Sequence, residues 1–411
     1  MNKYSIVGWS IFHESKPDAP PIVSVRIMVP LSVFHQSDGM PTVYINLIRN
    51  IIHRESRAYS IAGTPFVSWG LNHITIGIHT LEEDLKDFLI LIQQSLRLIP
   101  SKKMLDEELQ QQKNIDQWNA TQPRELMYGT LYEQYFGPQH SLRSDIDGTW
   151  KQRASIHHNR LAQVVDNSWP TSMVIVSRLR WDELASIIES SLKPTREIIS
   201  CSYQVPKSNW TNYAIPCSQS DQVGLMLTCP ARIINDQLEY ATELGLMCLA
   251  GMFHSRMNQK LRLNDGSTYG VECNYIRNKH WARIELSCFV HESQALQSWD
   301  SIQEVWNDAA NNWTEEELDK TRTILIRNER LREETCAYTC AIRANHLHIR
   351  NRTFSIEESC QKWKDISLND VQTVMSELAQ APQMSLCVGT ESSIKPLGFP
   401  IAPCPQKFVF S

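Results

Sequence analysis

The chain has 411 residues, of which 42% are apolar and 21% are charged, so it is long enough for two ordinary globular domains with full cores. Its net charge of −5 gives no electrostatic reason to expect a nucleic-acid partner. The longest apolar runs, such as residues 88–92, are far shorter than a membrane-spanning helix, so no membrane partner is expected either.

The N-terminal residues and the cysteines bear on where the protein is found. Residues 1–18 lack the apolar core and the small-residue cleavage site of a signal peptide, so we expect a cytoplasmic protein. All 11 cysteines lie between Cys201 and Cys404, in an odd number and at irregular spacing. Without an export signal, this pattern favours reduced thiols, most of them small core residues.

The first half of the chain predicts a strand, a helix, two strand segments and a long amphipathic helix. Apolar residues alternate along the first strand, and the amphipathic helix is expected to begin with a capping box formed by Thr80 and Glu83. These elements are expected at residues 22–30, 40–56, 64–79 and 81–99, followed by a charged helix start at 101–112 and a closing strand at 171–178.

The second half repeats this order of elements. Its first strand also alternates and also ends in proline, and its elements are expected at residues 222–230, 234–262, 268–278, 281–290, 314–325 and 383–390. The repeat indicates a tandem duplication, with homologous domains over 1–200 and 201–411. Strands and helices segregate instead of alternating strictly, which favours an α+β fold over a doubly wound parallel sheet.

One local motif in the second half strengthens this interpretation. Between His254 and Val271 the sequence reads HSRMNQKLRLNDGSTYGV. Together with the duplicated halves, it resembles the pitrilysin, insulinase and mitochondrial processing peptidase family, which has Ser-Arg-Leu, Leu-Arg, Gly and Tyr in this register. The corresponding residues here are Ser255-Arg256-Met257, Leu261-Arg262, Gly266 and Tyr269. The resemblance covers nearly the whole chain.

The resemblance implies two α/β-sandwich domains, each with an antiparallel-rich sheet of about six strands and helices on one face. It also implies that two such two-domain units close around a chamber that holds a peptide. Active members bind zinc through His-x-x-Glu-His on the helix after the first main strand, and through a later Glu. These three ligands leave an open position for a water molecule, which the Glu of the motif deprotonates.

This chain departs from the family at those zinc positions. Alignment on Gly39 places Thr42 and Asn46 at the two His positions and Ile45 at the Glu position. The third ligand is expected near residue 115, where the sequence of 114–117 is Asn-Ile-Asp-Gln. Ile cannot accept a proton, and Thr and Asn are weak zinc ligands. We therefore expect a degenerate zinc site, with no metal and no catalytic residue in this chain.

Arg262 and Tyr269 are the residues for which the resemblance implies a role. In the family, the matching Arg and Tyr reach into the chamber from the unit opposite the zinc site and contact the substrate backbone. A guanidinium and a phenol can both donate hydrogen bonds to a carbonyl that gains negative charge. Considered alone, a salt bridge for Arg262 and a packed strand position for Tyr269 are the commoner roles. Their retention beside a degenerate zinc site favours substrate binding.

A second group of residues, Cys336, Cys340, His346 and His348, contains side chains that can bind metals. The segment is expected to be helical, and on a helix the two Cys share a face while the two His point away from it. This arrangement favours ordinary buried or half-buried helix residues over a metal cluster.

These features favour a non-catalytic subunit of a heterodimeric zinc metallopeptidase. A partner chain of the same family would supply the zinc and the base, while this chain would complete the chamber and bind peptide through Arg262 and Tyr269. Pairs of this kind trim precursor peptides, including the leaders of modified natural-product peptides. The alternatives are a scaffold subunit, like the core proteins of the respiratory bc1 complex, and a free-standing peptidase with a rearranged metal site.

Overall fold

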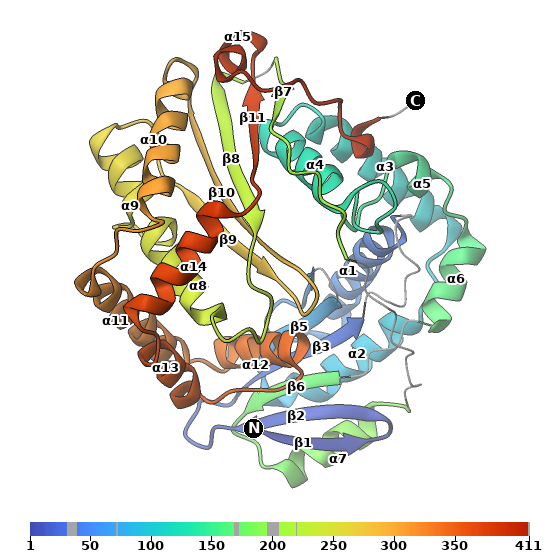
Figure 1. Ribbon diagram of the computed structural model, residues 1–411. Helices are drawn as coiled ribbons and strands as arrows, with labels where there is room; N and C mark the ends of the chain where they lie inside the picture. The colour runs from blue at the N-terminus through green and yellow to red at the C-terminus, as the bar shows by residue number, and fades with distance from the viewer. Residues whose placement is uncertain (31–38, 71–72, 168–171, 195–204, 219, 410–411) are drawn as a thin grey trace.

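The computed structural model describes residues 1–409 apart from 31–38, 71–72, 168–171, 195–204 and 219. Two β-sheets, each packed against helices, form the two halves of the molecule (Figure 1). The expected domain boundary between residues 200 and 201 lies outside the described residues. None of the helices in the described ranges combines the length and the apolar composition that a membrane crossing requires.

The first sheet has six strands in the order β1-β2-β6-β3-β5-β4. They are β1 (Asn2–Ile6), β2 (Trp9–Ser15), β3 (Ile22–Pro30), β4 (Phe66–Trp69), β5 (His73–Leu81) and β6 (Ser172–Ser177). β2 and β6 pair in parallel, and the other neighbours are antiparallel. β3 has the bounds that its alternating residues predict, and Val23, Val25 and Ile27 of this strand are buried in the core.

The helices of the first half are α1 (Met40–Tyr59), α2 (Leu85–Arg97), α3 (Lys102–Asn119), α4 (Pro123–Phe136), α5 (Trp150–Ala154), α6 (His158–Asn167) and α7 (Trp181–Ser191). The predicted capping box of Thr80 and Glu83 is wrong. A short 3₁₀ turn, η2 (Glu82–Asp84), precedes α2, and the Thr80 hydroxyl donates a hydrogen bond to Asp84 at 3.0 Å. The strand therefore runs on to Leu81, and α2 begins later than predicted.

The second sheet has five strands in the order β7-β11-β8-β10-β9. They are β7 (Tyr213–Pro216), β8 (Gln222–Pro230), β9 (Glu272–Arg277), β10 (Ala282–His291) and β11 (Met384–Gly389), and β7 and β11 form its parallel pair. The helices are α8 (Glu239–Leu246), α9 (Arg256–Asn258), α10 (Ala295–Asp308), α11 (Glu315–Arg332), α12 (Cys336–Arg350), α13 (Ile356–Lys364), α14 (Leu368–Gln380) and α15 (Glu391–Ile394).

The helix predicted over residues 234–262 is interrupted. α8 continues into a π-helical segment, η3 (Met247–Gly251), the chain then leaves the helix, and α9 continues into a second π segment, η4 (Gln259–Asn264). The Asn258 side chain, 7% exposed, donates hydrogen bonds to the main-chain oxygens of Met252 at 2.8 Å and Ala250 at 3.5 Å. It thereby satisfies carbonyl groups that a continuous helix would have satisfied.

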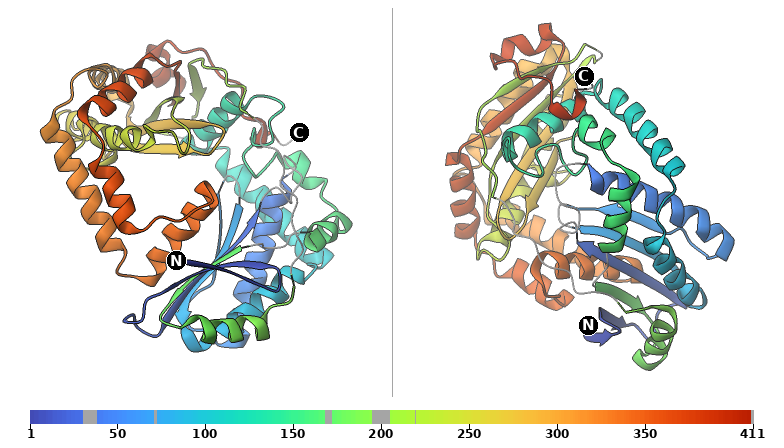
Figure 2. Two further views of the ribbon diagram at one scale, coloured as in Figure 1. Left: turned by 60° about the horizontal axis from the view of Figure 1, so that its bottom comes forward. Right: turned by 90° about the vertical axis from the view of Figure 1, so that its right-hand side faces the viewer.

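Each sheet is also covered on its second face by one helix from the other half. α4 packs on β8 and β11, where its Leu131 and Phe136 join Met226 and Leu386 in one apolar cluster. α12 packs on β3 and β6, where Cys340 lies in a cluster with sheet residues of the first half. Figure 2 shows these exchanged helices, α4 and α12, between the two sheets. The predicted α+β fold with two antiparallel-rich sheets is confirmed, with this exchange added to it.

Candidate functional site

The positions aligned with the zinc motif lie on the first turns of α1. Gly39 begins the helix with φ of 73°, and Thr42 and Asn46 are half-buried on it. Ile45 is 1% exposed and packs in the core of the first half. The Thr42 hydroxyl donates a hydrogen bond to Oδ1 of Asp147 at 2.8 Å. An ionised Glu at position 45 would therefore face apolar side chains, whereas Ile fits there.

The position of the expected third ligand is taken up by an ion pair. Asp116 on α3 pairs with Arg153 on α5, and their side chains are 14% and 1% exposed. The Arg153 guanidinium also donates hydrogen bonds to the main-chain oxygens of Asp147 and, at 3.1 Å, of Gly148. Burial lowers the pKa of Arg153 to about 10, so that it remains charged at neutral pH. Asp147 thus links Arg153 to Thr42.

These residues do not fit a zinc ion. The Thr42 hydroxyl and the Asp116 carboxylate are engaged with protein partners, and Ile45 has no lone pair to offer. Among the residues that the structure describes, no three His, Cys, Asp or Glu side chains gather closely enough to hold a metal. No step of a metal-dependent reaction can therefore be assigned to this site.

Arg262 and Tyr269 lie at the surface of the second half, around the end of η4. Arg262 is exposed, and its guanidinium lies over the ring of Phe253 at 4.5 Å. Tyr269 is 91% exposed, the highest value among the large apolar and aromatic side chains at the described surface. Phe253 and Leu263 are about half exposed beside them in the sequence. The two residues are therefore accessible, and the packed strand position considered for Tyr269 is not observed.

The main chain around Tyr269 is held by hydrogen bonds although the side chain is exposed. Ser267, before it, donates from both its main-chain nitrogen, at 2.8 Å, and its hydroxyl, at 3.0 Å, to the Leu261 oxygen. Thr268 donates to the oxygen of Phe289 on β10 at 2.9 Å. After it, the nitrogen of Val271 donates to Oδ1 of Asn258 at 3.0 Å. The loop presents an exposed phenol on a fixed backbone.

Asn258 is a positioning residue that the sequence analysis missed. Its side chain joins the Met252 carbonyl before the Arg262 segment to the Val271 nitrogen after Tyr269. The available signal was an amide between Met257 and Leu261, both of which are buried. Arg256, by contrast, pairs with Glu317 at 2.7 Å and lies over Trp313 at 4.1 Å, which is a structural role.

The two predicted groups of residues do not form one site within this chain. Thr42, Ile45 and Asn46 are on α1 in the first half, whereas Arg262 and Tyr269 follow α9 in the second half. Figure 1 draws α9 at the left edge of the molecule and α1 near its centre.

The Cys and His residues of α12 contact different parts of the first half. Cys340 donates to the Val174 oxygen at 3.4 Å, and His348 lies against His73 with ring centroids 3.5 Å apart. Burial lowers the pKa of His348 to about 4 and that of His73 to about 3.

Comparison with known proteins gives a family match for a segment that lies mostly in the second half. Residues 179–325 match the family model described as the peptidase M16 inactive domain, and this segment includes Arg262 and Tyr269. This segment is M16-like. M16 is the family of pitrilysin, insulinase and mitochondrial processing peptidase, so the predicted resemblance is confirmed for residues 179–325, which match an inactive M16 domain. No curated protein matches the chain in sequence.

Solved structures extend the likeness of this M16-like chain to nearly its full length. The peptidase M16 inactive domain from Pseudomonas fluorescens is 15% identical, with a TM-score of 0.84 over 95% of this chain and 97% of that one. A protease from Helicobacter pylori is 12% identical, with a TM-score of 0.82 over 94% and 99%. A chain of complex III2 from Candida albicans is 11% identical, with a TM-score of 0.74 over 99% and 98%. At these identities the likeness establishes a shared fold alone.

Proposed function

We propose that this M16-like chain is the non-catalytic subunit of a heterodimeric zinc metallopeptidase of the cytoplasm. Its partner would be an M16 chain with an intact His-x-x-Glu-His motif, which would supply the zinc and the general base. This chain would form the other wall of the chamber and bind a peptide, for example a precursor whose leader is trimmed. Arg262 and Tyr269 would donate hydrogen bonds to the peptide backbone.

The observation that carries this proposal is the fixed loop with an exposed Tyr269. A phenol that is 91% exposed contributes little to the stability of its own chain. The hydrogen bonds of Ser267, Thr268 and Asn258 nevertheless restrict the backbone on both sides of it. A donor held in place before its ligand arrives loses little conformational entropy on binding, which is the arrangement that favours recognition.

The first half supports the proposal of a partner. The ion pair of Asp116 and Arg153 and the hydrogen bond of Thr42 engage polar side chains at the positions aligned with zinc ligands. Arg262 and Tyr269 lie around η4 of the second half, whereas Thr42 lies on α1 of the first half. A peptide bound to the pair would therefore meet a metal only if a second chain brought one.

The second candidate function is a scaffold subunit without proteolytic role. The likeness that favours it is the one to a chain of complex III2 from Candida albicans, which covers 99% of this chain. The two candidates differ at the exposed pair. A peptidase subunit uses Arg262 and Tyr269 during cleavage, whereas a scaffold needs only the bulk of the second half.

Reconstitution tests the proposal. The full-length chain is purified alone and with a candidate M16 partner that has the zinc motif, and both preparations are assayed for zinc content and for cleavage of a fluorogenic peptide library. We expect the complex of the two chains to cleave peptides and this chain by itself not to. In the complex of the two chains, Tyr269→Phe and Arg262→Gln should each lower kcat/KM by about a hundredfold at unchanged zinc content. Arg327→Gln on α11, also exposed, is the matched control and should have no effect.

The outcomes separate the candidates. Cleavage by this chain alone, or a stoichiometric zinc ion in it, would overturn the proposal. A stable pair whose kcat/KM does not respond to Tyr269→Phe and Arg262→Gln would favour the scaffold function.

A further inference from the structure

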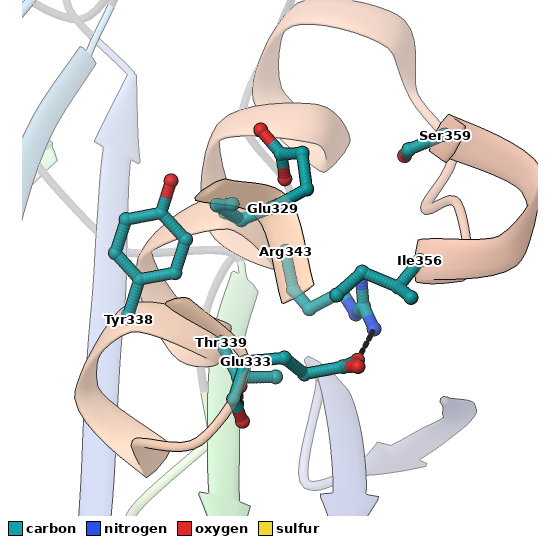
Figure 3. A pocket seen from close by; sticks show the side chains of 8 residues that line it. Glu329, Glu333, Tyr338, Thr339, Arg343, Ile356 and Ser359 are labelled. Atoms are coloured by element: carbon teal, nitrogen blue, oxygen red, sulfur yellow. Dashed lines mark hydrogen bonds and ion pairs between the residues drawn. The ribbon is translucent and has the colours of Figure 1, made fainter. Parts of the chain in front are cut away.

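The second half contains a cavity that is unrelated to the Arg262 and Tyr269 loop. It has a volume of about 210 Å³ and is lined by residues of α8, β9, α11, α12 and α13. A smaller pocket adjoins it and shares Glu329, Tyr338, Ile342 and Ser359 with its lining (Figure 3). The cavity is larger than a single water molecule requires and smaller than the pockets of roughly 300–1,000 Å³ that hold drug-sized ligands. It has room for one side chain or a small molecule.

The arginines in the wall of the cavity are already paired. Arg277 pairs with Glu239 at 2.8 Å and with Glu243 at 2.6 Å. Arg350 pairs with Glu239 through two hydrogen bonds of 2.5 and 2.7 Å. These guanidinium groups are therefore neutralised within the wall, and an anionic ligand would have to compete with Glu239 for them.

Glu329 is the acid of the wall that lacks a close cation. Among the described residues, its carboxylate meets a cation only at Arg332, at 4.0 Å. Arg332 is half exposed and donates a hydrogen bond of 2.8 Å to the Tyr338 hydroxyl instead. Figure 3 shows the Glu329 carboxylate turned away from the neighbouring pair of Arg343 and Glu333. Its side chain is 22% exposed, and burial raises its pKa because the charged form is poorly solvated there.

His346 provides a second polar atom in need of a partner. Within the described part of the chain, its buried Nδ1 has no hydrogen-bond partner. Burial, followed by the charge of Arg350, lowers the pKa of His346 to about 4, so the ring is neutral at pH 7 and one of its nitrogens is an acceptor. Because the positive charge of Arg350 acts on His346, a cationic group of a ligand would be repelled there, and we expect it at Glu329 instead.

We propose that this cavity binds a small organic cation whose ammonium or guanidinium group pairs with the Glu329 carboxylate. The ligand would supply the charge and the donors that Glu329 lacks, and its apolar part would lie against Tyr338, Ile342 and Trp363, which also line the cavity. Charge-assisted hydrogen bonds are stronger than neutral ones, and the partial burial of Glu329 favours them further. The cation is either a free amine or guanidine, or the Lys or Arg side chain of a peptide.

Calorimetric titration of the full-length chain tests the proposal with two ligands of the same shape. n-Butylguanidinium carries the charge, and n-butylurea does not. We expect saturable binding of the guanidinium, at least about tenfold tighter than that of the urea. Glu329→Gln should weaken guanidinium binding by at least about tenfold. Glu316→Gln is the matched control, because Glu316 is 79% exposed on the same helix, and it should leave binding unchanged.

A second pair of titrations identifies the source of the cation. The blocked tripeptide alanyl-arginyl-alanine and n-butylammonium are titrated beside n-butylguanidinium. Tighter binding of the tripeptide assigns the cavity to a peptide side chain, and tighter binding of the small cations assigns it to a free amine or guanidine. Equal binding of the urea, an unchanged affinity in Glu329→Gln, or no saturable binding of any of the three cations would overturn the proposal. If Glu329→Gln does not fold, the comparison of guanidinium with urea on the unmodified chain decides.

Discussion

Replacement of Arg153 by methionine tests whether a buried cation now holds together the region where the family binds zinc. Arg153 is 1% exposed and pairs with Asp116, which is 14% exposed. It also donates to main-chain oxygens in the segment that carries Asp147, the partner of Thr42. Methionine keeps most of the apolar stem but removes the charge and the donors, so the substitution isolates the electrostatic contribution.

The expected loss follows from what the substitution leaves behind. The Asp116 carboxylate would remain largely buried without a cation, and two main-chain oxygens would lose their donor. Removal of one partner from a buried ion pair costs about 3–5 kcal/mol, and because Asp116 keeps some contact with water we expect about 3 kcal/mol. The double variant Arg153→Met with Asp116→Leu removes the stranded charge and should recover most of that loss.

Urea unfolding, followed by tryptophan fluorescence, measures the shift in midpoint, and hydrogen–deuterium exchange reports the local effect on α1 and α3. Arg54→Met is the matched control, because Arg54 is 60% exposed and should change the stability by less than about 0.5 kcal/mol. A midpoint for Arg153→Met equal to that of Arg54→Met would refute the reasoning. So would a double variant that is no more stable than the single one.

Three further substitutions test separate features. Gly39→Ala should lower the free energy of unfolding by about 3 kcal/mol or more, because the added Cβ would overlap Arg153. Gly266→Ala, at a similar positive φ but in open space, should lower it by about 1 kcal/mol. Equal midpoints in urea for the two variants would contradict this. Asn258→Ala should cost about 2–3 kcal/mol and speed hydrogen exchange over residues 252–271, and exchange there that stays slow would count against its positioning role. Burial raises the pKa of Asp145 to about 6, above its ordinary 3.8, so the folded chain binds this proton more tightly and loses that stabilisation as the pH rises. The unfolding temperature of Asp145→Asn relative to the wild type should therefore increase between about pH 4 and pH 6 and level off above, and a difference independent of pH would exclude the titration.

The strands could be predicted to the residue where the signal was local. β3 and β8 have the predicted bounds, since alternation of apolar residues and a closing proline both act on the strand itself. The start of α2 was predicted too early, because Thr80 has more than one acidic partner within reach and bonds Asp84. The π segments of the second half were missed, since both are short and directly continue an α-helix, α8 or α9.

The sites show a similar division. The loss of zinc-binding residue types at Thr42, Ile45 and Asn46 can be read from the letters, but the burial of Arg153 beside them cannot, because it depends on a contact between α3 and α5. The exposure of Tyr269 was implied by the family and not by its neighbours in the sequence. Likewise, the sequence of α4 or α12 does not indicate that the helix packs against the sheet of the other half, because this depends on contacts between residues far apart in the chain.

The exchange of α4 and α12 has a consequence for how the molecule can be assembled. A cut of the backbone between the halves would leave two fragments that each lack the helix covering one sheet face and each carry the helix that the other needs. Each fragment expressed alone would expose a large apolar sheet face, whereas the two fragments expressed together would bind one another. The packing of each exchanged helix on the sheet of the other half would then hold the two halves together without the polypeptide link.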